Sequence, residues 1–134
     1  MIQFTSLKVT KIYKYMVLYL KLDQKAWARL DYTDDATYDL SGTVYDDERF
    51  ATTRNISGFT PTLRFIDQYG NYVYENTTDI TVSGSSGIFL VKFTQTNAPY
   101  LKGLYKCRLI LEKSGSRITA VGVNGSDDLF FESG

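Results

Sequence analysis

Hydrophobic and polar side chains alternate in several short segments of the chain. The alternation is clearest between residues 105 and 111, and it is typical of a β-strand with one face against a core. In this segment and four similar ones, the side chains expected to face the core are Tyr105, Cys107, Leu109 and Leu111; Phe89, Val91 and Phe93; Leu63 and Phe65; Val121 and Val123; and Leu129 and Phe131. The opposite face of the first segment would carry Lys106, Arg108 and Ile110.

Glycine, serine and asparagine separate these segments. The stretches 83–87 and 114–116 have the composition of hairpin connections, and residues 69–71 have that of a turn. Short strands with turns at this spacing indicate an all-β chain folded as an antiparallel sandwich or barrel.

The N-terminal quarter of the chain fits two patterns. One set of side chains has the spacing of a helix face: Val9, Ile12, Tyr13, Met16, Val17 and Leu20. The same segment also alternates as a strand would. Tyr15, Val17 and Tyr19 would lie on one face, and the other face would carry Met16, Leu18, Leu20 and Leu22. The residue types favour the strand. The apolar run 15–20 is too short to span a bilayer, which needs ~20 residues, so we expect no membrane segment.

Composition narrows the function. The 134 residues suggest one domain, and 15 basic against 15 acidic side chains argue against a general nucleic-acid binder. The chain has no histidine, which excludes histidine-dependent nucleophiles and histidine metal ligands. The single cysteine, Cys107, excludes an internal disulfide and a thiolate zinc cluster. We therefore expect a protein that is not an enzyme, with no catalytic residues, no cofactor and no metal.

The charges are balanced overall but segregated along the chain. Residues 1–29 carry six basic side chains and one acidic one, and residues 31–48 carry seven acidic side chains and no basic one. Opposite blocks of this kind could pair within one molecule or orient the docking of one molecule on another. They could also be solvated strand edges that are kept charged against aggregation.

Three groups of side chains are candidates for a site. The oxygen-rich stretches 31–35 and 124–128 could hold calcium, but they lack the ligand spacing of a known calcium loop and turn chemistry explains them. No carboxylate pair is singled out for glycoside hydrolysis. Tyr72 and Tyr74 alternate with polar neighbours and could form an exposed aromatic strip that stacks on a glycan or anchors a protein interface.

The stretch Gly103-Leu104-Tyr105-Lys106-Cys107 is similar to the Gly/Ala-x-Tyr-x-Cys stretch of immunoglobulin-like domains, although the partner cysteine is missing. The order of segments over residues 34–132 resembles the immunoglobulin-like domain at the N-terminus of phage baseplate upper proteins and of small tailed-phage virion proteins. Ile56-Ser57-Gly58 matches a step before the second strand of that family, and Gly103 to Tyr105 matches the start of its penultimate hairpin.

The resemblance implies an immunoglobulin-like β-sandwich over residues 31–134, preceded by an extension over residues 1–30 that has no counterpart in the family. It also implies a non-catalytic structural protein of the virion, a connector or surface subunit of the tail, baseplate or capsid. Its partners would be other virion proteins or further copies of itself. The extension would dock on a neighbouring subunit through Lys8, Lys11 and Lys14. The alternative is a carbohydrate-binding module or adhesin that recognises a cell-surface glycan through Tyr72 and Tyr74.

Overall fold

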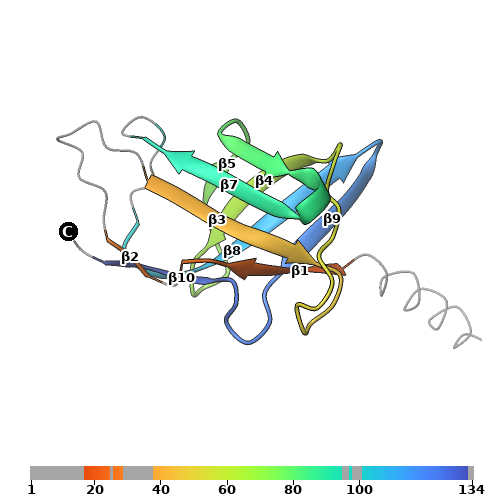
Figure 1. Cartoon of the computed structure of the whole chain (residues 1–134). Coiled ribbons are helices and arrows are strands. Elements are labelled where there is room, and N and C mark those ends of the chain that lie inside the picture. Colours follow the sequence, from red (N-terminus) through yellow and green to blue (C-terminus); the bar gives the residue numbers. More distant parts are fainter. Residues whose placement is uncertain (1–16, 25, 29–37, 95–96, 98–100, 133–134) are drawn as a thin grey trace, which may run out of the picture.

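The computed structural model describes residues 17–24, 26–28, 38–94, 97 and 101–132. Within them the chain forms ten strands and one 3-10 turn, which confirms the predicted all-β class (Figure 1). None of these residues belongs to a helix with the length and apolarity needed to cross a membrane. The elements are β1 (Val17–Leu22), β2 (Ala26–Ala28), β3 (Tyr38–Tyr45), β4 (Thr60–Ile66), β5 (Tyr72–Asn76), β6 (Ile80–Ser83), η1 (Gly84–Ser86), β7 (Ile88–Phe93), β8 (Gly103–Lys113), β9 (Ser116–Val121) and β10 (Asp128–Glu132).

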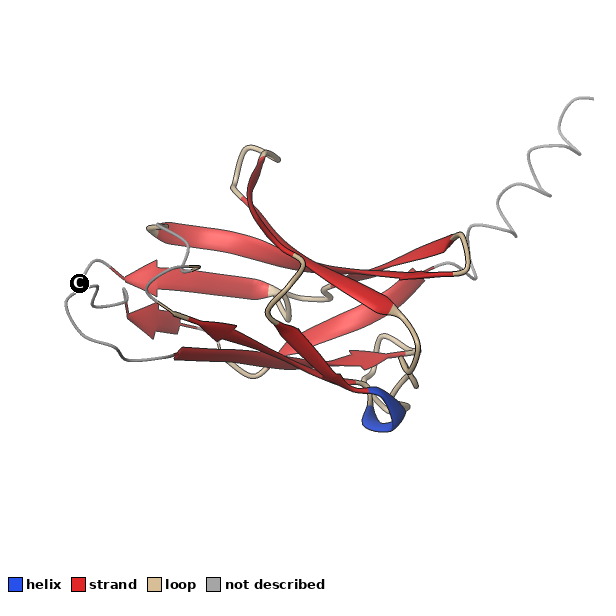
Figure 2. Cartoon of the chain, turned by 90° about the horizontal axis from the view of Figure 1, so that it is seen from above, coloured by secondary structure: helices blue, strands red, loops and turns tan. Residues whose placement is uncertain are grey.

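The strands pack as two layers, seen from above in Figure 2. One layer has the order β6, β7, β3, and the other has the order β5, β4, β8. Along the other edge of β8, β9 pairs with residues 109–113 and β10 pairs with residues 103–106. Neighbours in both layers are antiparallel. This arrangement is that of an immunoglobulin-like sandwich, as predicted.

Strand β1 joins the two layers, which makes the sandwich barrel-like. It pairs antiparallel with β3 on one edge and parallel with β9 on the other, and β2 continues this path in parallel with β10. The sheet is therefore mixed, whereas a purely antiparallel one was expected.

The sequence-based division at residue 30 is wrong for residues 17–24 and 26–28, which belong to the sandwich and not to a docking extension. The physical reason is that Leu18, Leu20 and Leu22 all point into the core and are buried. Lys8, Lys11 and Lys14, the basic residues predicted to dock on a neighbouring subunit, lie outside the described residues. Their docking role therefore stays a prediction.

The core lies between the layers, with Phe65, Phe89 and Phe93 fully buried. Most side chains predicted to face inward do so, and Tyr105 packs against the core while half-buried. Val121 and Val123 are only partly buried. Ala120 takes the inward position on β9 because the register places it beside buried Leu109.

The outward face of β8 also differs from the prediction at one position. Ile110, expected to be exposed, is buried. Its register partners are Thr62 on β4 and Thr119 on β9, and neither of these threonines is exposed.

Two local features support the predicted immunoglobulin-like course of β8. The hairpin to β9 turns through Ser114 and Gly115, both with positive φ (50° and 84°), as a tight two-residue turn between strands requires. At the start of β8 the Tyr105 hydroxyl donates to the carbonyl of Lys102 at 2.9 Å. A tyrosine two residues before a cysteine, bonded back to upstream backbone, is a feature of this sandwich class. The cysteine that follows, Cys107, is fully buried in the core, and this burial raises the pKa of its thiol.

Candidate functional site

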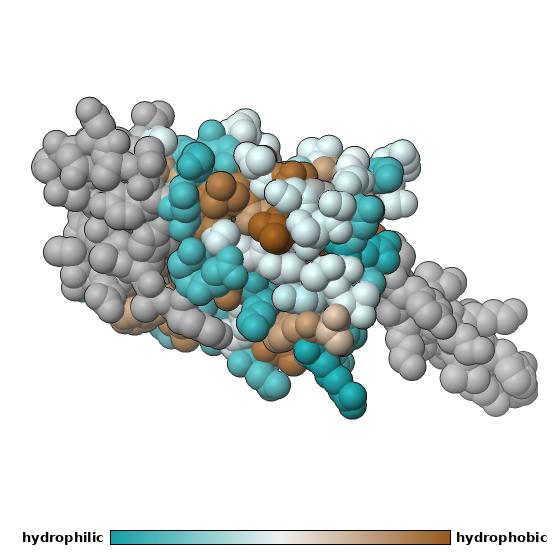
Figure 3. Space-filling view, in the orientation of Figure 1, coloured by the Kyte–Doolittle hydropathy of each residue, from teal (hydrophilic) through white to brown (hydrophobic). Residues whose placement is uncertain are grey.

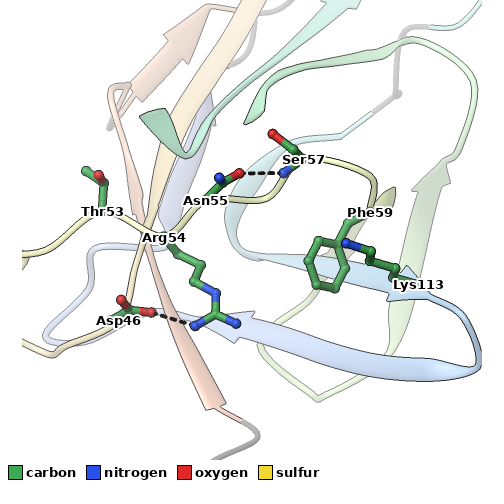
Figure 4. A pocket seen from close by; sticks show the side chains of 7 residues that line it. All are labelled: Asp46, Thr53, Arg54, Asn55, Ser57, Phe59 and Lys113. Atoms are coloured by element: carbon green, nitrogen blue, oxygen red, sulfur yellow. Dashed lines mark hydrogen bonds and ion pairs between the residues drawn. The ribbon is translucent and has the colours of Figure 1, made fainter. Parts of the chain in front are cut away.

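A polar cleft lies at the end of the sandwich where β3 leads into the 46–59 loop (Figure 4). Its volume is about 600 Å³. The residues that line it are Asp46, Thr53, Arg54, Asn55, Ser57, Phe59 and Lys113. Two cations, one aromatic ring and several short polar side chains thus face a common hollow.

The charged groups of this cleft already have partners. Arg54 Nη1 lies 3.3 Å from the Asp46 carboxylate. The Lys113 ammonium lies 5.3 Å from the centre of the Phe59 ring, within range of a cation–π contact that occupies one face of the ring. The Asn55 side-chain carbonyl accepts from the Ser57 amide at 2.9 Å. The cleft is therefore satisfied as it stands, which favours a structural role in fixing the 46–59 loop.

The two tyrosines predicted to form an aromatic strip lie on opposite faces of β5. Phe65 is opposite Tyr74 in the register but Ile66 is opposite Tyr72, so Val73 is an extra, bulged residue. A bulge of this kind reverses the alternation of side chains beyond it. The prediction that Tyr72 and Tyr74 form one exposed aromatic strip is therefore wrong.

Each tyrosine has its own surroundings. Tyr74 packs on the core, with its ring centre 5.1 Å from that of Phe65, and burial raises the pKa of its phenol. Its hydroxyl donates to the Asn97 carbonyl at 2.9 Å. Tyr72 is 58% exposed on the outer face, where the Arg64 guanidinium lies 4.7 Å from its ring centre.

Tyr72 belongs to a second candidate site on the outer face of the β5–β4–β8–β10 layer. We call this surface the outer-face patch and define it by Ile66, Tyr72, Leu104, Lys106, Arg108 and Phe130. Leu104 and Phe130 are register partners with 50% and 43% of their surface exposed. Ile66 lies between Tyr72 on β5 and Lys106 on β8. The patch therefore crosses four strands of a rigid layer.

A hollow of about 360 Å³ lies within the patch. Ile66, Leu104, Lys106 and Arg108 line it together with residues of the 67–70 turn. It thus joins an apolar floor to the cationic side chains of Lys106 and Arg108 and to the acidic Asp67, a combination that suits a ligand or partner group with both an apolar body and a charge.

The charges around the patch are paired, with one exception. Lys106 Nζ lies 2.7 Å from the carboxylate of Asp128 and 3.6 Å from that of Asp127, and the hydrogen bond to Asp128 raises the pKa of Lys106. Arg64 Nε donates to Glu75 at 2.9 Å. Arg108 has no ion pair among the described residues, and its buried Nε–H has no hydrogen-bond partner there. The outer-face patch therefore holds an arginine without an ion pair among the described residues, which the cleft does not.

Figure 3 shows the described residues of the molecule from one side, coloured by hydropathy. In the view of Figure 3, hydrophobic colour forms separate spots among polar residues. Isolated apolar side chains are ordinary on a protein surface, whereas a patch beside a hollow needs an explanation.

The turn beside the patch depends on one carboxylate. Asp67 accepts from the backbone N–H groups of Asn71 and Tyr69, both at 2.9 Å, and these bonds, that of Asn71 above all, hold the pKa of Asp67 below its ordinary 3.8. Because the pKa of Asp67 is lower in the folded state, its ionised carboxylate stabilises the folded state at pH values above the ordinary pKa. This contribution disappears as the pH falls through the pKa of the folded state. We expect Asp67→Ala to lower the urea midpoint at about pH 7 and to change it much less at about pH 2.

The measurement is urea unfolding of both proteins across that range, with Asp67→Asn, which keeps the acceptor oxygen but not the charge, as the control. An equal difference between Asp67→Ala and the parent protein at every pH would contradict the role of the charge.

Two of the acidic side chains considered as calcium ligands have a different partner in the structure. In the 124–128 stretch, the carboxylates of Asp127 and Asp128 contact Lys106. The other stretch, 31–35, lies outside the described residues. The described part of the chain contains no group of three or more cysteine, aspartate or glutamate side chains placed to hold a metal ion.

Comparisons with known proteins give no family. No family model matches the chain, and no curated protein matches its sequence. Among solved structures, an endo-beta-1,4-mannanase from Thermotoga petrophila is similar at 11% identity over 87% of this chain, with a TM-score of 0.45. This chain spans only 20% of the mannanase. The major subunit of aggregative adherence fimbriae type I from Escherichia coli is similar at 10% identity over 85% of this chain and 93% of its own, with a TM-score of 0.35. Both proteins are points of comparison and carry no argument about function.

Proposed function

We propose that this protein is a non-catalytic structural subunit that acts by assembly with further copies of itself, as a connector or surface component of a tailed-phage virion. The observation that carries the assembly role is the outer-face patch. Leu104 and Phe130 expose about half of their surface side by side on a rigid layer. Neighbouring exposed apolar side chains with polar residues around them mark sites of protein interaction. The virion setting rests on the sequence resemblance alone.

A rigid sandwich suits this role. Every strand of the patch is hydrogen-bonded to its neighbours in the layer, so the backbone that carries the patch is held in place before a partner arrives. A surface held in this way loses little conformational entropy on binding. The body of the protein would then act as a spacer with a fixed docking face.

Sedimentation velocity tests the proposal. From about 1 μM to about 1 mM, we expect the average mass of the full chain to rise above the 15.2 kDa of one copy. The double variant Leu104→Ser/Phe130→Ser should stay near the mass of one copy. The matched control is Val17→Ser/Ile88→Ser, which removes two side chains of similar exposure (40% and 41%) from outside the patch and should assemble like the parent.

A parent chain that stays at the mass of one copy throughout would overturn the proposal, as would equal assembly of both double variants. Circular dichroism of each variant establishes that it is folded. Glycan-array binding by the parent chain, lost on Tyr72→Ala, would instead favour the carbohydrate-binding alternative.

A further inference from the structure

We propose that the outer-face patch binds the 46–50 loop of a second copy of this chain, with the Glu48 carboxylate placed on the Arg108 guanidinium. This inference rests on the proposed assembly function and names the two surfaces that meet. It predicts a head-to-tail contact.

The first step is the charge on Arg108. Its register partner on β4 is Arg64, a like charge directly opposite, which is unfavourable unless both cations find anions. Arg64 has Glu75 at 2.9 Å, but Arg108 has no anion among the described residues. A partly buried cation without a counter-charge costs stability that a carboxylate from outside would recover.

The second step is the setting of that cation. Arg108 shares its hollow with the apolar side chains of Ile66 and Leu104. A free anion would satisfy the charge but would leave Leu104 and Phe130 exposed. A protein loop that brings a carboxylate would satisfy the charge and also shield the apolar surface around it from water, so a protein partner fits better than a small ion.

The third step is the source of the carboxylate. A second copy of the chain brings the same 15 acidic side chains, so the carboxylate can come from the chain itself. Among the acids whose side chains are described, only Glu48 and Glu112 have no hydrogen bond or ion pair with described residues. Glu112 lies directly opposite Arg117 in the register. Glu48 is exposed and faces no such partner across a strand.

The loop that carries Glu48 is held in shape. The Asp47 carboxylate accepts from the backbone N–H groups of Thr52 and Ala51, at 3.0 and 3.1 Å from one oxygen. The Phe50 ring packs against that of Tyr45 with their centres 5.0 Å apart. These contacts present Glu48 on a preformed loop, which lowers the entropy lost on docking.

The loop and the patch lie toward opposite ends of the sandwich. The 46–59 loop leads into Thr60, which pairs with Glu112 near the end of β8, whereas Ile66 pairs with Lys106 near its start. One copy cannot bring these two surfaces together. Two different surfaces in contact make a head-to-tail interface that repeats from copy to copy, as a structural assembly requires.

Charge reversal tests the contact in the full chain. By sedimentation velocity, Arg108→Glu and Glu48→Arg should each raise the dissociation constant roughly 10- to 100-fold. The double variant Arg108→Glu/Glu48→Arg should recover most of that loss, because the pair is restored with its charges exchanged. The matched control is Arg117→Glu, an exposed arginine on the same layer, which should assemble like the parent.

The outcomes separate this inference from the proposed function. If Leu104→Ser/Phe130→Ser abolishes assembly while the Glu48 and Arg108 variants do not change it, the assembly function stands and the Glu48–Arg108 contact is wrong. If each reversal weakens assembly and the double variant gives no recovery, the two residues do not meet and the contact is again wrong. A parent chain that does not self-associate overturns both.

Discussion

Replacing Phe65 by alanine is expected to lower the free energy of unfolding by about 3–5 kcal/mol. Phe65 is fully buried between the two layers. Its ring centre lies 5.1, 5.7 and 6.3 Å from those of Tyr74, Phe131 and Phe93. The substitution removes the transfer free energy of the ring and leaves a cavity that rigid strands cannot fill. Because domains are stable by only about 5–15 kcal/mol, much of the total would be lost.

Urea unfolding followed by fluorescence measures this loss. Tyr69→Ala is the control, because Tyr69 is 79% exposed and its removal should change stability by no more than about 0.5 kcal/mol. If Phe65→Ala does not fold, Phe65→Leu keeps most of the volume and should cost about 1–2 kcal/mol. A loss below about 1 kcal/mol for Phe65→Ala would mean that the ring is not central to the core.

Much of this core could be predicted from the sequence, because strand alternation depends on neighbours only two residues apart. The set Cys107, Leu109 and Leu111 shows this, since all three are buried. The prediction failed on β9, where Val121 was preferred to Ala120. Hydrophobicity ranks valine above alanine, but the hairpin register decides which side chain points inward, and it places Ala120 beside Leu109.

The candidate site was harder to predict, because it depends on pairings between distant segments. Tyr72 and Tyr74 share a face in any regular strand, and only the bulge at Val73 separates them. Leu104 and Phe130 are 26 positions apart and become neighbours through the β8–β10 register. The sequence did place Arg108 on the outward face of its strand. The sequence could not show that Arg108 lacks an acidic partner, because this depends on where the acidic side chains of the other strands lie.

The N-terminal segment shows how a true pattern can receive the wrong role. The alternation of Leu18, Leu20 and Leu22 correctly predicted a strand over these residues. The net positive charge of residues 1–29 then suggested an arm that docks elsewhere. Leucines that face inward at alternate positions need a core to pack against. Pairing with the edges of β3 and β9 places them in the core of the same molecule.

Removing residues 2–22 is therefore expected to abolish cooperative unfolding of the sandwich. The deletion takes away β1, which is hydrogen-bonded to both layers. It also removes three buried leucines, each of which contributes about 1.5–3 kcal/mol. Their sum is comparable to the whole stability of a typical domain. The Ser126 hydroxyl would lose its acceptor as well, since it donates to the Leu20 carbonyl at 2.7 Å inside the protein.

Near-UV circular dichroism and urea unfolding of the truncated chain measure this effect, and point variants on the two faces of β1 locate it. Leu20→Ala should cost about 2–5 kcal/mol, whereas Lys21→Ala, on the exposed face, should cost less than about 0.5 kcal/mol. A peptide of residues 17–22 added to the truncated chain should restore folding, because it supplies the strand that both edges lack. A truncated chain that unfolds cooperatively at the parent's urea midpoint would show that β1 is dispensable, and a docking role for residues 17–22 would then regain its place.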